Sequence, residues 1–109
     1  MTIYSYSRTS DLESSMEANQ LQVILGPEIL AVQTYCLSRN WFISEAINDI
    51  NCSWNLKFHN RKQGKHLMGL LESGDILVCS KLERIISSSQ EIVELISKFR
   101  AKNVQLHIS

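Results

Sequence analysis

The chain has 109 residues, of which 44% are hydrophobic and 20% charged, as expected for a single globular domain with one core. Eleven Lys and Arg balance eleven Asp and Glu, so the overall charge gives no sign of a polyanionic partner, although a local cluster of arginines remains possible. No apolar run approaches the roughly 18 residues of a membrane span, and the N-terminus lacks the basic and apolar regions of a signal peptide, so we expect a cytoplasmic protein that does not bind membranes.

The first predicted element is a strand over residues 2–8, where apolar and small polar side chains alternate. The polar stretch 9–19 follows without apolar periodicity. Pro27 is predicted to open a helix, because its missing N–H has no partner in the first turn of a helix. The helix is expected to run to about Arg39, with an apolar stripe formed by Ile29, Leu30, Val32, Cys36 and Leu37.

In the middle of the chain, residues 41–47 indicate a second strand and residues 48–60 are polar and irregular. Leucine spacing predicts a helix over 62–72, ended by Gly74 in a left-handed conformation. The three cysteines, Cys36, Cys52 and Cys79, are far apart and form no C-x-x-C pair. They therefore indicate reduced, mostly buried thiols and neither a disulfide framework nor a zinc site.

The C-terminal part begins with the wholly apolar run 76–79, which is typical of a strand covered on both faces. Ser87 and Ser88 each begin a capping box before a further helix. The buried stripe of that helix is predicted to consist of Ile92, Leu95, Ile96 and Phe99. Alternating apolar residues over 104–108 predict the last strand.

Alternating strands and helices, with a strand buried on both faces, predict an α/β fold with a largely parallel sheet of four to five strands flanked by helices. In such folds, the loops at the carboxyl ends of the strands form the functional site. Residues 8–10 and 80–87 should therefore lie on the same rim, with Ser10 close to Arg84.

Two segments on this rim resemble motifs of one family. YSYSRTS, residues 4–10, is similar to Y-x-R-V-S of the serine recombinases, the resolvase and DNA invertase family, and LLESGDILVCSKLERI is similar to L-x-x-G-D-x-L-V-V-x-K-L-D-R-L. Arg61 lies where the family has the arginine that opens R-P-x-L-x-x-L-L. Tyr35, Trp41, Asp49 and Ser53 are also spaced like family positions. The resemblance covers residues 1–109 apart from an apparent insertion near residues 19–26.

The resemblance implies a site-specific recombinase domain that cleaves and rejoins DNA. The hydroxyl of Ser10 would attack a phosphodiester, leaving a 5′-phosphoserine and a free 3′-hydroxyl, and no ATP, other cofactor or metal is implied. Arg8, Arg61 and Arg84 would surround the phosphate. Arginine suits this role because its planar fork meets two phosphate oxygens, and cations must stabilise the charge of the transition state where no metal does so.

Further implications concern individual residues and partners. Glu83 stands in the place of an aspartate that would orient an arginine or handle a proton, and the side chain of Arg84 is expected to be exposed on the rim. The partners would be DNA and, in the full-length active form, a homodimer or tetramer. Residues 1–109 lack the long dimer helix and the helix-turn-helix domain with which family members usually continue.

Two departures from the family pattern bear on activity. Ser87 stands where the family usually has a second arginine, whose loss would cost about 2.7–4 kcal/mol by analogy with the loss of an oxyanion donor. Ser14 and Glu28 lie near the positions of two glutamines that follow the nucleophile in the family.

Each residue also has a simpler interpretation. Ser10 and Glu13 form an S-x-x-E pattern, so Ser10 can be a helix cap. Glu83 and Arg84 can be an exposed ion pair, and Arg61 can belong to the solvated face of a helix. The alternative function is a catalytically degenerate recombinase fold that associates with DNA or with a partner subunit. An unrelated flavodoxin-like domain is disfavoured because the chain has no glycine-rich phosphate loop.

Overall fold

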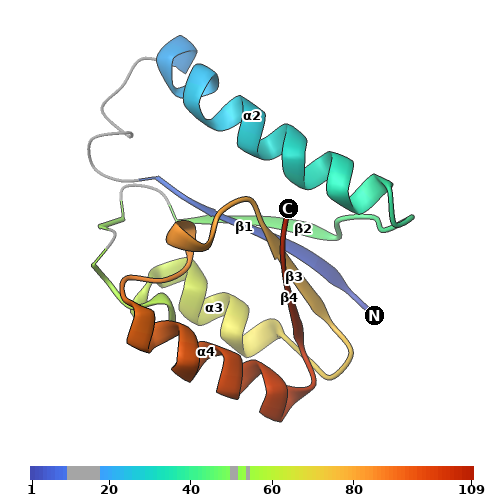
Figure 1. Cartoon of the computed structure of the whole chain (residues 1–109), viewed down its shortest axis with the longest axis vertical. Helices are drawn as coiled ribbons and strands as arrows, with labels where there is room; N and C mark the ends of the chain where they lie inside the picture. Colours follow the sequence, from blue (N-terminus) through green and yellow to red (C-terminus); the bar gives the residue numbers. More distant parts are fainter. Residues whose placement is uncertain (10–17, 50–51, 54) are drawn as a thin grey trace.

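The computed structural model describes residues 1–9, 18–49, 52–53 and 55–109. Four strands form one parallel sheet in the order β2-β1-β3-β4, which confirms the predicted parallel α/β fold (Figure 1). The strands are β1 (Ile3–Arg8), β2 (Glu45–Asp49), β3 (Ile76–Cys79) and β4 (Gln105–Ile108).

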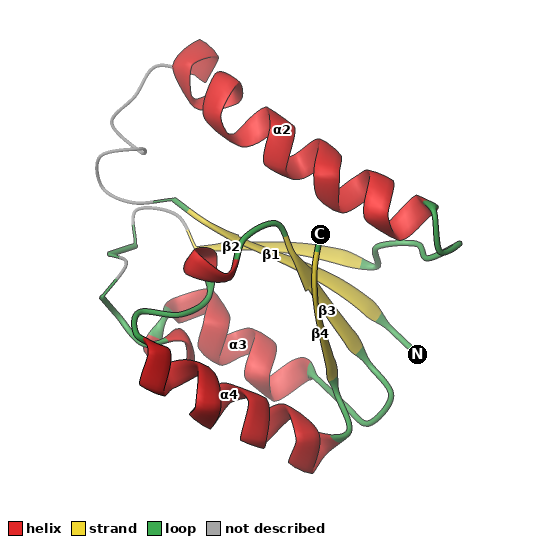
Figure 2. Ribbon diagram, in the orientation of Figure 1, coloured by secondary structure: helices red, strands yellow, loops and turns green. Residues whose placement is uncertain are grey.

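Within the described residues, three helices cover the two faces of this sheet. Helices α3 (Lys62–Leu70) and α4 (Ser89–Lys102) lie together on one face, and α2 (Ala18–Leu37) lies on the other (Figure 2). Two short 3-10 turns, η1 (Phe58–Asn60) and η2 (Leu82–Arg84), precede α3 and α4. None of the helices in the described ranges is long and apolar enough to cross a membrane.

The inner strand β3 divides the core into two layers. Ile76 and Val78 pack with Val32 and Cys36 below helix α2, whereas Leu77 and Cys79 contribute to the larger cluster below α3 and α4. All four residues of β3 are buried, as the apolar run predicted. Apolar side chains pointing to both faces of one strand allow the sheet to carry helices on each side.

The prediction that Pro27 opens a helix was wrong. It lies inside α2. The φ angle of proline suits a helix, but an internal proline removes one backbone hydrogen bond, so the helix continues past it only where other contacts compensate. Val32 and Cys36, which are buried against the sheet, hold the following turns of α2 in place. The apparent insertion at residues 19–26 therefore belongs to this helix.

Other boundaries differ by a few residues. Strand β2 begins at Glu45, while Trp41 and Ile43 pack on the core from the loop before it. Gly74 has the predicted left-handed conformation, with φ of 89°, but it lies in the turn before β3, because α3 already ends at Leu70. Cys36 and Cys79 are buried free thiols, as predicted, and burial raises the pKa of Cys79 to about 12.

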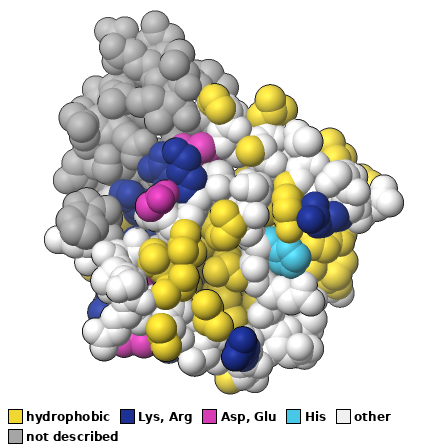
Figure 3. Space-filling model, viewed as in Figure 1, with side chains coloured by type: hydrophobic (Ala, Val, Ile, Leu, Met, Phe, Trp, Pro, Cys, Tyr) yellow, Lys and Arg dark blue, Asp and Glu magenta, His cyan; other side chains and the backbone are white. Residues whose placement is uncertain are grey.

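The apolar stripe of α4 is only half buried. Leu95 and Phe99 lie in the core, whereas Ile96 is 38% exposed and Ile92 is partly exposed. Hydrophobic side chains accordingly gather on the surface beside α4 and β4 (Figure 3). The prediction of four buried positions was wrong because β4 is a short edge strand, and it covers only part of the helix.

Candidate functional site

Arg8 ends strand β1 at the carboxyl edge of the sheet, and its side chain is turned inward. The residue is only 6% exposed, and its Nη1 donates a 2.9 Å hydrogen bond to the carbonyl of Cys52. The segment that holds Cys52 is itself tied to the strand end, since the N–H of Cys52 donates to the carbonyl of Thr9. Cys52, which follows β2 in the chain, thus contacts the guanidinium of Arg8.

Arg61 lies directly before α3 and is completely buried. Its Nε donates to the carbonyl of Leu56 at 2.8 Å, and its Nη1 donates to the hydroxyl of Tyr6 at 3.2 Å and to the carbonyl of Arg84 at 2.5 Å. The interpretation of Arg61 as part of a solvated helix face is therefore wrong. The lysine next to it, Lys62, faces solvent instead, because adjacent residues at a helix start point in different directions.

Arg84, in turn η2, joins the two motifs of the rim. Its Nη1 donates a 3.1 Å hydrogen bond to the carbonyl of Arg8, so the strand ends of β1 and β3 meet as predicted. Its Nε and Nη2 donate to the two carboxylate oxygens of Glu28, at 3.1 and 2.7 Å. Basic and acidic side chains accordingly lie side by side on the surface (Figure 3).

The prediction that the side chain of Arg84 is exposed was wrong. It is 11% exposed, because Glu28 reaches over it from helix α2. Glu83, by contrast, is exposed to solvent. The carboxylate that the structure places on Arg84 therefore comes from a distant helix, and no local spacing in the sequence indicated this partner.

A buried polar network lies below the arginines. Asp49, which is 3% exposed, accepts hydrogen bonds from the hydroxyl of Tyr6 at 2.7 Å and from the N–H groups of Gln63 and Gly64 at 2.7 and 3.0 Å. It therefore caps the first turn of α3 and satisfies donors that have no partner in the helix. Because Tyr6 bonds both Asp49 and Arg61, it links this cap to the arginine cluster. Burial raises the pKa of Tyr6 and keeps its hydroxyl protonated.

Ser87 takes part in the cap of α4. Its N–H and its hydroxyl both donate to Oε2 of Glu91, at 2.7 and 2.6 Å, and Oε1 of Glu91 accepts from the N–H of Phe58 at 2.7 Å. Ser88 is the N-cap, and its hydroxyl accepts from the N–H of Glu91, so one half of the second predicted capping box forms. The carboxylate of Glu91 accepts from the N–H of Ser87, one residue before the cap. Ser87 thus has a structural partner at the position where the family usually has an arginine.

Ser10, the predicted nucleophile, lies outside the described residues, as does Ser14, which was expected near the position of a family glutamine. The three arginines are brought together, through the hydrogen bonds of Arg61 to Arg84 and of Arg84 to Arg8. All three lie at the carboxyl edge from which residue 10 follows.

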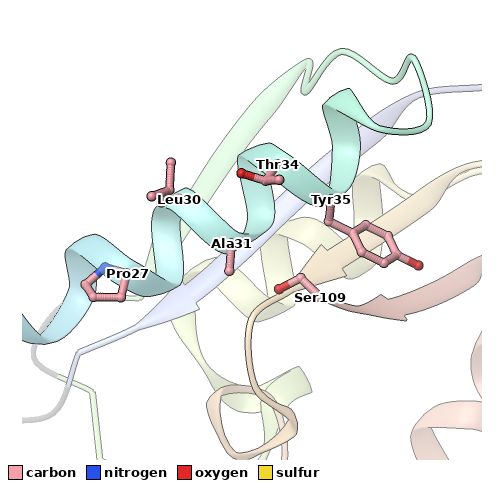
Figure 4. Close-up of a pocket in the computed structure, with 6 residues that line it drawn as sticks. All are labelled: Pro27, Leu30, Ala31, Thr34, Tyr35 and Ser109. Atoms are coloured by element: carbon pink, nitrogen blue, oxygen red, sulfur yellow. The ribbon is translucent and has the colours of Figure 1, made fainter.

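A separate hollow lies between α2 and the C-terminal end of β4 (Figure 4). It is lined by Pro27, Leu30, Ala31, Thr34, Tyr35 and Ser109. No lining side chain is charged, so this hollow offers no cation to neutralise a phosphate. The arginine cluster is the better candidate site.

Comparison with known proteins shows the family of the chain. The sequence profile described as "Resolvase, N terminal domain" matches residues 3–109. The chain belongs to the resolvase family of serine recombinases. The family predicted from the two rim motifs is therefore confirmed.

Solved structures with the same fold are also serine recombinases or transposon proteins. The C-terminal catalytic domain of ISC1926 TnpA, an IS607-like serine recombinase, has 18% identity and a TM-score of 0.68, covering 99% of this chain and 67% of that chain. The N-terminal catalytic domain of TP901-1 integrase has 17% identity and a TM-score of 0.71, covering 97% of this chain and 75% of that one.

A third structure, the first open reading frame of transposon ISC1904 from Sulfolobus solfataricus P2, has 18% identity and a TM-score of 0.60. It covers 99% of this resolvase-family chain, which spans 66% of its length. No curated protein matches the sequence. At such identities, the similarity to solved structures establishes the fold alone.

Proposed function

We propose that this resolvase-family domain is the catalytic domain of a site-specific DNA recombinase that uses Ser10 as its nucleophile. The observation that carries the proposal is the 3.1 Å hydrogen bond from Arg84 to the carbonyl of Arg8. It joins residues 81–84 (KLER) to strand β1, after which Ser10 follows in the sequence. The two motifs of the family resemblance therefore meet at one edge of the sheet.

In the proposed reaction, the hydroxyl oxygen of Ser10 forms a bond to a DNA phosphorus, and the bond from phosphorus to the 3′-oxygen breaks. The serine proton passes to a base, and the 3′-oxygen gains a proton to become a hydroxyl. Attack by a 3′-hydroxyl on the phosphoserine reverses these steps after strand exchange. Because the phosphoserine conserves one phosphodiester bond, the cycle needs neither ATP nor another cofactor.

The cluster supports such chemistry through charge. The transition state spreads negative charge over the equatorial oxygens of phosphorus, and guanidinium groups at fixed positions stabilise it. Arg8 and Arg84 are the proposed phosphate contacts. Arg61 is buried and bonded to the backbone of Arg84, which favours a supporting role in which it holds that turn in place. Glu83, exposed beside Arg84, is the proposed group for orienting an arginine or moving a proton.

The partners and location follow as part of the same proposal. DNA is the substrate, the full-length active form is a homodimer or tetramer, and the protein acts in the cytoplasm.

The test is a search for a covalent protein–DNA adduct. The full-length protein is incubated with supercoiled plasmid carrying the DNA that flanks its gene, then denatured and analysed for protein attached to 5′ ends. We expect an adduct that Ser10→Ala abolishes. Ser7→Ala, which removes a hydroxyl from the same strand, serves as the control and should retain it.

A second candidate function is a degenerate domain that binds DNA or an intact partner subunit without cutting. The observation that favours it is Ser87, whose N–H and hydroxyl are both bonded to Glu91 where the family usually has an arginine. Absence of any adduct from the unmodified full-length protein, together with retained DNA binding in a mobility assay, would establish this second function instead.

A further inference from the structure

Glu28 holds the guanidinium of Arg84 with both oxygens of its carboxylate. Oε1 accepts from Nε at 3.1 Å and Oε2 accepts from Nη2 at 2.7 Å. The hydroxyl of Ser80 donates a further 2.7 Å hydrogen bond to Oε1. The two charged side chains are only 12% and 11% exposed, so solvent screens this ion pair weakly.

The paired edge of Arg84 is the kind of surface that binds a phosphate. Two parallel N–H groups of a guanidinium meet two oxygens of a carboxylate or of a phosphate with the same geometry. A single edge cannot hold both anions at once. A phosphate that uses Nε and Nη2 of Arg84 must therefore displace Glu28.

Glu28 is charged at neutral pH. Burial alone would raise the pKa of its carboxyl, but the hydrogen bonds from Arg84 and Ser80, together with the attraction of Arg84 and Lys81, outweigh burial and lower it. The carboxylate also compensates a nearly buried cation, which would otherwise be costly. Exchange of Glu28 for a phosphate would keep Arg84 neutralised in both states.

We propose that Glu28 is an internal competitor that occupies Arg84 until a phosphate displaces it. The inference rests on the proposed function, because it takes Arg84 to be a phosphate contact. Glu28 belongs to helix α2, whereas Ser80 and Arg84 belong to the loop after β3. Displacement by phosphate therefore also breaks the polar tie between α2 and this loop, and so couples the position of α2 to occupancy of the site.

The test measures binding of inorganic phosphate by calorimetry and by the shift in Tm. Glu28→Gln keeps an oxygen and the side-chain length but removes the competing charge, and we expect it to bind phosphate about tenfold more tightly than the parent or better. Glu94→Gln removes a glutamate from the exposed pair with Lys57 and should leave the affinity within about twofold of the parent. Arg84→Ala added to Glu28→Gln should abolish the gain.

Equal phosphate affinity of Glu28→Gln and the parent, or a gain that survives Arg84→Ala, would overturn the proposal. Circular dichroism checks the fold of Glu28→Gln, and Ser80→Ala offers a milder variant that weakens the hold of Glu28 by one hydrogen bond. If Glu28→Gln does not fold, the proposal requires Ser80→Ala to bind phosphate more tightly than the parent. Equal phosphate affinity of Ser80→Ala and the parent would then overturn the proposal. This measurement does not depend on DNA cleavage. Tighter phosphate binding by Glu28→Gln without a Ser10 adduct would refute only the proposed function. A Ser10 adduct without tighter phosphate binding would refute only the role of Glu28 as a competitor.

Discussion

The buried guanidinium of Arg61 donates a 2.5 Å hydrogen bond to the backbone carbonyl of Arg84. One arginine thereby fixes the position of the turn that carries another. Since Arg61 also contacts Leu56 and Tyr6, it ties three segments of the chain to one group. We expect its loss to affect the stability of the domain as well as the geometry of the site.

Arg61→Lys should lower the free energy of unfolding by about 3 kcal/mol or more. The ammonium group of a lysine lacks the planar set of N–H donors with which the guanidinium bonds its three acceptors. Urea denaturation measures the change. Lys62→Ala, at the exposed neighbouring position, should stay within about 0.5 kcal/mol of the parent. A loss below about 1 kcal/mol in Arg61→Lys would show that the hydrogen bonds of the buried arginine contribute little.

Tyr6→Phe should destabilise the domain by about 1–3 kcal/mol, since it leaves buried groups of Asp49 and Arg61 without the hydroxyl that bonds both. Tyr4→Phe is the matched control on the same strand. The hydroxyl of Tyr4 has no hydrogen bond to any described residue, so the free energy of unfolding should hardly change. If both variants behave alike in chemical denaturation, the proposed link between Asp49 and Arg61 is unimportant.

Gly64→Ala and Gly69→Ala should have opposite effects although both glycines lie in α3. A Cβ at Gly64 would lie 2.1 Å from the carbonyl oxygen of Phe58, so η1 or the helix must shift, and we expect a loss of about 2 kcal/mol or more. A Cβ at Gly69 meets no atom within 4 Å, so alanine should stabilise the helix by about 0.5–1 kcal/mol. Thermal unfolding of the two variants shows whether each substitution raises or lowers the stability of the domain. Destabilisation of equal size in both would contradict the close approach at Gly64.

Glu91 should make stability depend on pH in the acid range. Burial would raise the pKa of its carboxyl, but the hydrogen bonds from Phe58 and Ser87 and the attraction of Arg61 outweigh burial and lower it below the ordinary value of 4.5. A lowered pKa in the folded state means that the charged carboxylate stabilises the fold above pH 4.5, and that this contribution is lost as pH falls through the folded pKa.

Urea unfolding between pH 7 and pH 3 tests this expectation. Glu91→Gln should be less stable than the parent at neutral pH, and the difference should shrink below about pH 4.5. Glu94→Gln, on the exposed side of the same helix, should show a small difference at every pH. A difference for Glu91→Gln that stays constant over the range would argue against a charged Glu91 in the cap.

Ser87→Arg restores the residue type that the family usually has at this position. If the proposed function holds, we expect the variant to form the Ser10 adduct about tenfold faster or more, by analogy with the gain of one oxyanion donor. The loss of the 2.6 Å hydroxyl bond to Glu91 should cost about 1 kcal/mol of stability. Ser89→Arg adds the same charge at an exposed position two residues later, and an equal rate gain there would show a non-specific attraction to DNA instead.

The amino-acid sequence by itself determined the α/β class, the family and the edge of the sheet at which Arg8 and Arg84 meet. Strand β3 could be predicted because a short apolar run between polar segments is typical of a strand covered on both faces, and the turn before it because Gly74 tolerates a positive φ, although α3 itself ends earlier, at Leu70. These signals are local, since they depend on the residue itself and its immediate neighbours. The rim was predictable as well, because the carboxyl ends of parallel strands share one edge.

Only the tertiary structure decided what each charged group contacts. The carboxylate of Glu28 reaches Arg84 across 56 positions of sequence, and Arg61 is buried although its neighbours Lys62 and Lys65 are exposed. Pro27 lies within a helix because residues far away in the chain pack against the turns that follow it. A charge is buried only where distant groups supply its hydrogen bonds and its counter-charge, and the folded arrangement of the chain sets those distances.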